Sequence, residues 1–228
     1  MAGDSTTAPE DTYQGPRHDG EYERLRIQHE MTKKLMHGRL VLAPDLARQC
    51  APTAKLVGAD IAPDRFPRQL PANVSLFAHN IFDEWPKSTR NKFDLVHQRF
   101  VPPVCSNDMR IDVIRKLLAC VRPGGYLMLH DADFDTIEKG HGHTAMERLR
   151  DVLRQSWSLL GYNLSPGPKL REEVLQIHGI EASIGKLPGF LFSAKQFSEL
   201  KRDLREELEV TGNSYRTHVV WTRKEIEV

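Results

Sequence analysis

Asp60 is the first residue whose type and position could support chemistry. It follows the short, mostly apolar run Leu56–Ala59, and a helix-compatible segment comes after it. In open α/β sheets, ligands bind at the carboxyl ends of the strands, and a carboxylate there can accept hydrogen bonds from both hydroxyls of a ribose. Asp60 is therefore a candidate ligand of a nucleoside-type cofactor. The alternative is a local role, because aspartate also caps helices and turns.

His97 is the second candidate, as a general acid or base. It closes a short strand-like run, Phe93–His97. An imidazole titrates near neutral pH, which suits proton transfer at a strand end. A histidine that only fixes a loop explains the same pattern equally well.

Two further polar groups resemble metal ligands without forming a complete set. His141 and His143 have no cysteine or acidic ligand at metal spacing, which favours a solvated loop. Asp131, Asp133 and Asp135 follow a strand, but the glycine and glutamate of a calcium loop are missing. We therefore predict no metal site. The three aspartates are instead candidates for the lining of an acceptor pocket.

Composition limits the class of protein. The 228 residues are enough for one domain with a full core, and the chain is 39% hydrophobic and 28% charged. A net charge of +1 creates no field that would attract nucleic acid or a membrane, and no apolar run approaches the ~20 residues of a membrane span. The N-terminus is polar and acidic, unlike a signal peptide. Three scattered cysteines argue against a disulfide framework or a zinc knuckle, so we expect a cytoplasmic protein.

The elements that must position Asp60 and His97 follow from the spacing of apolar residues. Residues 1–19 predict a flexible tail, and residues 20–228 predict one domain, which opens with a helix ending near Gly38. Strands are predicted at Lys55–Ala59, Val74–Asn80, Phe93–His97, Tyr126–Asp131 and, at the sheet edge, Tyr215–Arg223. Helices are predicted at Met109–Val121, Thr144–Leu160, Leu170–His178 and Ser193–Val210, with a short helix at Asp45–Cys50 and a candidate strand at Ile180–Ile184. This alternation favours a mostly parallel sheet with helices on both faces.

Five segments carry a resemblance to a known family. They are Glu21–His29 (Glu-x-x-Arg-Leu-x-x-Gln-His), Val57–Pro63, Asn80–Pro86, Phe93–Arg99 and Arg122–Leu127. In this order and spacing, most of the chain resembles class I S-adenosylmethionine-dependent methyltransferases, above all the small fungal, LaeA-like enzymes of secondary metabolism. The resemblance implies a Rossmann-like α/β fold, S-adenosylmethionine as the cofactor, and methyl transfer to a small molecule.

The resemblance also implies roles for single residues. Asp60 is expected to bind the ribose hydroxyls, and Asn80 lies beside the adenine, where the family usually has aspartate. His97 stands where the methyl donor meets its acceptor and is the candidate catalytic residue. The positions assigned to the cofactor are Asp60, Ile61, Asn80, Ile81 and Gln98. The Arg-Pro-Gly-Gly turn is structural, because glycine permits the backbone geometry of a tight turn. A homodimer or a pathway protein is the candidate assembly partner.

One feature of the family is missing from the sequence. A first strand ending in a glycine-rich Asp-x-Gly-x-Gly loop should lie just before Asp45–Cys50, where glycines let the backbone approach the cofactor. Here Ala43-Pro44 runs straight into Asp45, and no glycine lies between Gly38 and Gly58. We therefore predict that the first strand and its loop are truncated.

Three interpretations of this truncation remain open. Leu40–Ala43 could take the place of the first strand and leave an altered pocket. The fold could persist in a catalytically silent accessory or binding protein that assists a pathway. The sequence could also be a mis-spliced product of a gene for a normal enzyme. Since a missing central strand would leave buried backbone groups unpaired, we predict the rescue by Leu40–Ala43.

Overall fold

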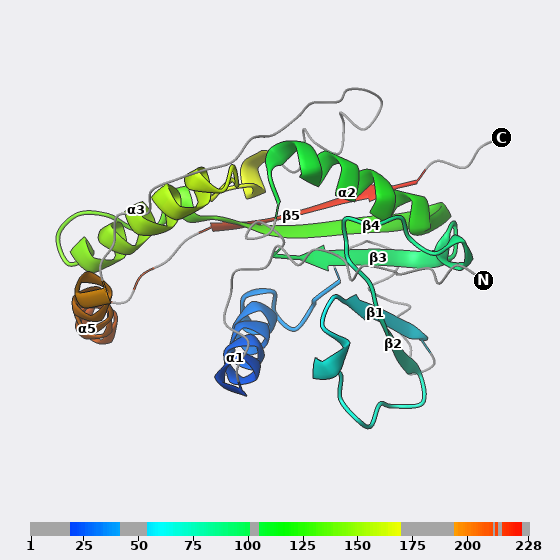
Figure 1. Ribbon diagram of the computed structural model, residues 1–228, viewed down its shortest axis with the longest axis horizontal. Coiled ribbons are helices and arrows are strands. Elements are labelled where there is room, and N and C mark those ends of the chain that lie inside the picture. Colours follow the sequence, from blue (N-terminus) through cyan, green and yellow to red (C-terminus); the bar gives the residue numbers. More distant parts are fainter. Residues whose placement is uncertain are drawn as a thin grey trace, which may run out of the picture. The chain divides into compact units, whose positions relative to one another are not determined.

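The computed structural model describes residues 19–41, 54–100, 105–169, 194–211, 213 and 216–224, and these form an α/β protein (Figure 1). The elements are α1 (Asp19–Leu35), β1 (Leu56–Asp60), β2 (Val74–Ala78), β3 (Phe93–Arg99), α2 (Asn107–Cys120), β4 (Val121–Asp133), α3 (Thr144–Leu159), α5 (Ala194–Val210) and β5 (Arg216–Arg223). They belong to two compact units, Met1–Arg90 and Asn91–Val228. The predicted elements at Asp45–Cys50, Leu170–His178 and Ile180–Ile184 lie outside the described residues, as does most of the predicted tail. The division into a tail and one domain therefore stays a prediction.

In the first unit, α1 ends close to the predicted place. His37 and Gly38 both have a positive φ, 50° and 77°. The Gly38 amide donates to the Lys33 carbonyl and the His37 amide to the Lys34 carbonyl, which is the Schellman pattern of a helix C-terminus. The first left-handed residue is thus His37, one position before the glycine that the sequence suggested. Among the described residues, no helix is long and apolar enough to cross a membrane.

The first unit contains a two-stranded parallel sheet. β1 pairs with β2 from Leu56 opposite Val74 to Asp60 opposite Ala78. The sequence predicted β1 as a buried strand, and this is wrong: Leu56 is 55% exposed and Val57 is 44% exposed. A parallel strand is buried when neighbours flank it and helices cover it, whereas the described part of the chain pairs β1 with β2 alone.

The second unit contains a three-stranded sheet in the order β3-β4-β5, with α2 running along it (Figure 1). β3 and β4 are parallel, and β5 returns antiparallel to β4 at the sheet edge, as predicted. Leu127, Met128 and Leu129 are consecutive in β4 and at most 1% exposed, so both faces of this strand are covered. The helix predicted at Met109–Val121 is α2, which begins after Ser106, whose hydroxyl accepts the Met109 amide.

The predicted α/β class with parallel strands and flanking helices is confirmed, but the strands form two sheets instead of one. The predicted rescue by Leu40–Ala43 is not met by Leu40 and Val41, which belong to no strand; the other two residues lie outside the described part. In the described ranges, no strand stands between α1 and β1. The predicted truncation of the first strand therefore stays a prediction.

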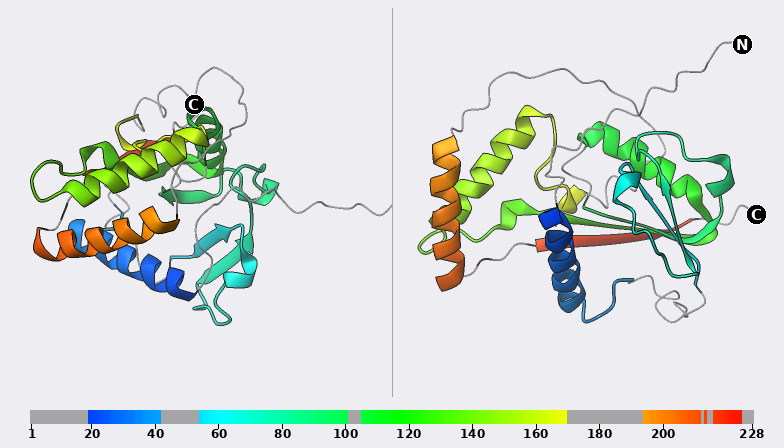
Figure 2. Two further views of the ribbon diagram at one scale, coloured as in Figure 1. Left: turned by 60° about the vertical axis from the view of Figure 1, so that its left-hand side comes forward. Right: turned by 60° about the horizontal axis from the view of Figure 1, so that its bottom comes forward.

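Within the second unit, α5 packs against α3 (Figure 2). The Glu207 carboxylate of α5 accepts hydrogen bonds from two backbone amides in the first turn of α3, those of Ala145 and Met146. His143, at the N-cap position, makes no capping bond with its side chain. Glu207 therefore caps α3 from another helix and places a negative charge at the positive end of its dipole.

Replacing Glu207 by alanine is expected to lower the free energy of unfolding by about 1–2 kcal/mol, the usual cost of a lost helix cap. Urea denaturation followed by circular dichroism measures this loss. The matched control is Glu209→Ala, which removes an exposed carboxylate from the same helix and should change stability by less than about 0.5 kcal/mol. Equal losses in the two variants would contradict the capping role.

Candidate functional site

Asp60 lies at the carboxyl end of β1, where the sequence predicted it. Its main-chain carbonyl accepts the His79 amide at 2.9 Å, which ties it to the end of β2. Its Oδ1 accepts the Ala62 amide at 2.9 Å, so the local turn-capping role is real. Within the described ranges, Oδ2 has no hydrogen-bond partner, and the residue is exposed. Asp60 therefore caps a turn with one carboxylate oxygen, and the other is available to a ligand.

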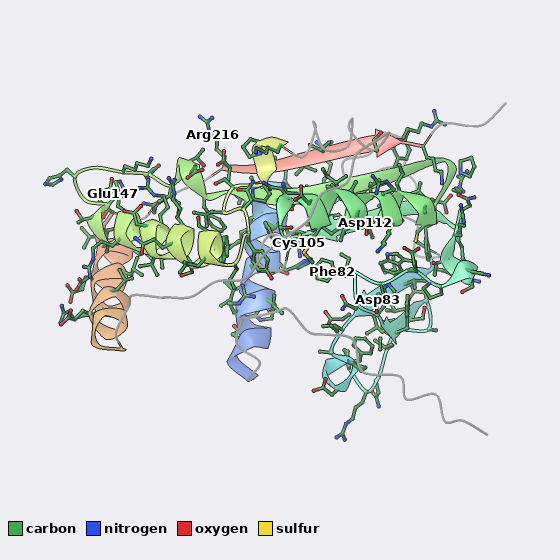
Figure 3. The ribbon with its side chains drawn as sticks, turned by 45° about the horizontal axis from the view of Figure 1, so that its top comes forward. Phe82, Asp83, Cys105, Asp112, Glu147 and Arg216 are labelled. Carbon is green, nitrogen blue, oxygen red and sulfur yellow. The ribbon has the colours of Figure 1, made fainter. Side chains whose placement is uncertain are left out.

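Asn80 follows the carboxyl end of β2, two residues beyond Ala78, which pairs with Asp60, and it is 7% exposed. Its Oδ1 accepts the Phe82 amide at 3.1 Å, and its carbonyl accepts the Asp83 amide at 2.9 Å. Figure 3 labels Phe82 and Asp83 in this turn. An asparagine side chain forms this turn as well as an aspartate would, since both offer an oxygen acceptor. Asn80 thus fixes the backbone on which Ile81 lies.

Three aromatic rings pack beside this edge of the sheet. The rings of His79 and Trp85 have centroids 4.2 Å apart, and Phe77 lies about equally far from both, at 6.0 and 6.1 Å. The indole nitrogen of Trp85 is buried and has no hydrogen-bond partner within the described part of the chain. Trp85 therefore packs on Phe77 and His79.

His97 lies on β3, in the second unit. It keeps an exposed surface, but partial burial lowers the pKa of its imidazole to about 4, and the positive charge of Arg99 adds to this shift. The imidazole is therefore neutral at pH 7. Gln98 is its neighbour on the strand, so the two side chains point to opposite faces of the sheet.

His130 is a buried residue that sequence analysis did not single out. It is 2% exposed and lies on β4 opposite Arg99 in the register. Its ring packs on Phe100, with 5.0 Å between centroids, and its Nε2 has no hydrogen-bond partner in the described ranges. Burial first, and then the charges of Arg99 and His97, lower its pKa to about 4. Its position between Leu129 and Asp131, near the end of a predicted strand, was the only sequence signal.

The polar groups considered for metal binding have other roles. Among the residues described, no three histidine, cysteine, aspartate or glutamate side chains gather as a metal site would require. His143 Nδ1 lies 3.0 Å from the Asn213 amide nitrogen, and its Nε2 lies 3.6 Å from Glu138. Asp131 and Asp133 are buried, at 0% and 7% exposed, so of the three alternating aspartates Asp135 is the one that reaches the surface.

The predicted cofactor residues fall into two groups. Asp60, Ile61, Asn80 and Ile81 lie together at the carboxyl edge of β1 and β2, with hydrogen bonds that hold the edge in shape. This arrangement fits the nucleoside end of S-adenosylmethionine, because the unpartnered Oδ2 of Asp60 suits a hydroxyl donor. His97 and Gln98 belong to the other unit. The described residues include no glycine-rich loop for the methionine end of the cofactor.

Comparison with known proteins finds methyltransferases among the relatives of this chain. No family model matches the sequence. The chain is 31% identical to "N-methyltransferase tcpN" of Claviceps purpurea, over 91% of this chain and 95% of that protein. It is 27% identical to "N-methyltransferase sirN" of Leptosphaeria maculans, over 98% and 99% of the two chains. A Haloferax volcanii methyltransferase complex with the activator Trm112 gives a TM-score of 0.47 at 13% identity, over 87% of this chain and 93% of that one.

The alignment with the Claviceps protein bears on the missing loop. It runs over 268 positions, more than the 228 residues of this chain. Part of the relative therefore falls opposite gaps in this chain. This is the relation expected of a chain that lacks an internal block.

Proposed function

The chain belongs to the fungal N-methyltransferases, and we propose that it transfers a methyl group from S-adenosylmethionine to a nitrogen atom of a small molecule in secondary metabolism. The observation that carries the proposal is the shared carboxyl edge of β1 and β2. Asp60 lies at the end of one strand and Asn80 follows the other, and hydrogen bonds to neighbouring backbone amides hold each of them in place. In α/β sheets this is the edge at which nucleoside cofactors bind.

Four residues would hold the nucleoside end of the cofactor. Asp60 would accept the ribose hydroxyls through its free carboxylate oxygen, while Ile61 and Ile81 would contact the adenine with apolar side chains. Asn80 would act indirectly, because its amide oxygen holds the turn on which Ile81 lies. The bound cofactor supplies an electrophilic sulfonium methyl group, so the protein has mainly to position donor and acceptor.

His97 would serve the acceptor as a neutral imidazole. Because its pKa is lowered to about 4, it carries no charge at pH 7 and can accept a hydrogen bond from an acceptor N–H. A base this weak orients the nitrogen lone pair better than it removes a proton, since proton transfer is most efficient when the pKa lies near the working pH. Gln98 is proposed as a further cofactor contact from the same strand.

The proposed setting is the cytoplasm. The sequence has three scattered cysteines, of which Cys105 and Cys120 are buried. Such a pattern is usual in a reducing compartment. This supports the proposal that the protein acts there.

Calorimetric titration with S-adenosylhomocysteine and S-adenosylmethionine tests the proposal. We expect binding with a Kd on the order of micromolar, and weakening by at least about tenfold in Asp60→Ala, which corresponds to the loss of a hydrogen bond to a charged group. Asp112→Ala is the matched control. It removes an exposed aspartate from α2 that makes only surface ion pairs, and the Kd should not change.

Absence of heat at millimolar ligand, from protein whose circular dichroism shows that it is folded, would overturn the proposal. The catalytically silent accessory role would then be the better explanation. If Asp60→Ala binds the cofactor as strongly as the parent, the protein binds the cofactor but Asp60 is not one of the residues that hold it.

A further inference from the structure

His79 joins the two strand ends that carry the proposed nucleoside site. Its amide donates to the Asp60 carbonyl at 2.9 Å, so its backbone is fixed to the end of β1. Its neighbour in the sequence is Asn80, which opens the turn on which Ile81 lies. A contact that fixes the His79 ring therefore bears on both Asp60 and the turn.

Trp85 makes such a contact from the far end of the turn. Its ring centroid lies 4.2 Å from that of His79, at an interplanar angle of 43°. It also lies 6.1 Å from the ring centroid of Phe77 in β2, with the two rings edge to face. Hydrogen bonds to Asn80 hold the beginning of the same turn. The turn is thus anchored at both ends, with Ile81 between the anchors.

The ring of Trp85, and not its N–H group, holds the residue in place. The indole nitrogen is buried and has no hydrogen-bond partner within the described ranges. A buried donor without a partner costs free energy, and a buried tryptophan usually finds one. Trp85 therefore contributes its aromatic surface. Phenylalanine, which has a ring and no donor, should replace it, whereas leucine is apolar but offers no ring face to His79.

We propose that Trp85 and His79 are positioning residues of the nucleoside site, and that their ring pair sets the separation between Asp60 and Ile81. The nucleoside part of this statement rests on the proposed function, whereas the bracing of the strand ends does not. Without the ring pair, the turn samples other conformations. The apparent affinity for a nucleoside then falls with the fraction of molecules that keep the binding conformation.

Calorimetric titration with S-adenosylhomocysteine measures this affinity. Trp85→Leu and His79→Leu are each expected to bind about tenfold more weakly than the parent, and Trp85→Phe within about threefold of it. Both leucine variants break the same ring pair, so Trp85→Leu/His79→Leu should also lose only about tenfold. The same losses are expected for 5′-methylthioadenosine, which has the nucleoside and lacks the amino acid. Losses that multiply to about a hundredfold would overturn the proposal, because the two rings would then act independently.

Leu70→Ala is the matched control. It removes an exposed apolar side chain from the segment before β2, in the same unit. It should bind S-adenosylhomocysteine as the parent does, and circular dichroism should show every variant folded. Equal losses in Trp85→Phe and Trp85→Leu would contradict a role for the aromatic ring.

Amide hydrogen exchange of the ligand-free protein tests the bracing itself. The His79 and Phe82 amides make hydrogen bonds to Asp60 and Asn80, at the two places that the ring pair is proposed to hold. In Trp85→Leu both amides should exchange about tenfold faster than in the parent, because local opening becomes easier. In Trp85→Phe they should exchange at close to the parent's rate.

The Val74 amide is the internal control for this measurement. It donates to the Pro71 carbonyl at the other end of β2 and should keep the parent's exchange rate in Trp85→Leu. Faster exchange at Val74 as well would mean that Trp85 supports the whole unit instead of the turn, and this would overturn the positioning role.

The two measurements separate this inference from the proposed function. If the parent binds S-adenosylhomocysteine and Trp85→Leu binds it equally well, the positioning role is refuted and the proposed function stands. If Trp85→Leu speeds exchange at His79 and Phe82 but the parent binds no S-adenosylhomocysteine, the methyltransferase proposal is refuted. The ring pair then remains the brace of the strand ends.

Discussion

Gly125→Ala is expected to lower the free energy of unfolding by about 3 kcal/mol, near the upper end of what overpacking costs. A Cβ at this position would lie 2.9 Å from the Asp94 carbonyl oxygen and 3.0 Å from the Phe93 carbonyl oxygen. Both belong to the backbone of β3, which cannot move aside without breaking its pairing with β4. The glycine therefore permits the close approach of two strands at the start of the buried part of β4.

Urea denaturation measures this loss, and Gly161→Ala is the control. Gly161 has a φ of 71° but nothing within 4 Å of its added Cβ, so its replacement strains the backbone without a clash. We expect it to cost about 1 kcal/mol. Similar losses in the two variants would mean that β3 and β4 move apart to admit the methyl group. This would contradict the close approach of the two strands at Gly125.

Acid is expected to destabilise the second unit through His130. Its pKa is about 4 in the folded chain and near 6.5 when unfolded, so between these values the unfolded state binds a proton that the folded state does not. Stability is therefore complete above pH 6.5 and is lost as the pH falls toward 4. A shift of this size corresponds to a loss of up to roughly 3 kcal/mol, to which His97 adds in the same direction.

Urea denaturation at pH 7.5 and at pH 5 measures this effect. In His130→Gln, the difference in stability between the two pH values should shrink, because the buried titrating group is gone. His141→Gln, an exposed loop residue, should keep the parent's difference. An unchanged pH dependence in His130→Gln would show that other groups carry the acid sensitivity.

Local signals predicted the second unit well. The apolar stripe of α2 and the run that becomes β4 are features of neighbouring residues, and both are found where the sequence placed them. The predicted turn at Arg-Pro-Gly-Gly is wrong, because these four residues lie inside β4, at an irregularity in its pairing with β3. The two glycines of this segment have different roles. Gly124, with a φ of 76°, adopts a left-handed backbone conformation. Gly125 leaves room for the backbone carbonyls of Phe93 and Asp94.

Burial and sheet continuity could not be predicted in the same way, because they depend on residues distant in the sequence. The apolar run of β1 indicates a covered strand, yet its exposure depends on which strand pairs with its other edge. The same limit applies to the candidate site. Asp60 and Asn80 follow strands and are visible in the sequence, whereas Arg99 and His130 meet only through the pairing of β3 with β4.

The division of the sheet also affects how this protein behaves among copies of itself. Within the described residues, β1 and β3 each pair along one edge only, so their other edges display unpaired amides and carbonyls. Such edges can pair with a strand of another molecule and so promote aggregation. The exposed side chains of Leu56 and Val57 add apolar surface to the β1 edge. Lys55 precedes that strand and Asp60 ends it, and charges in these positions oppose pairing with another molecule. The tendency of this edge to aggregate therefore depends on two charges that flank the four residues Leu56–Ala59.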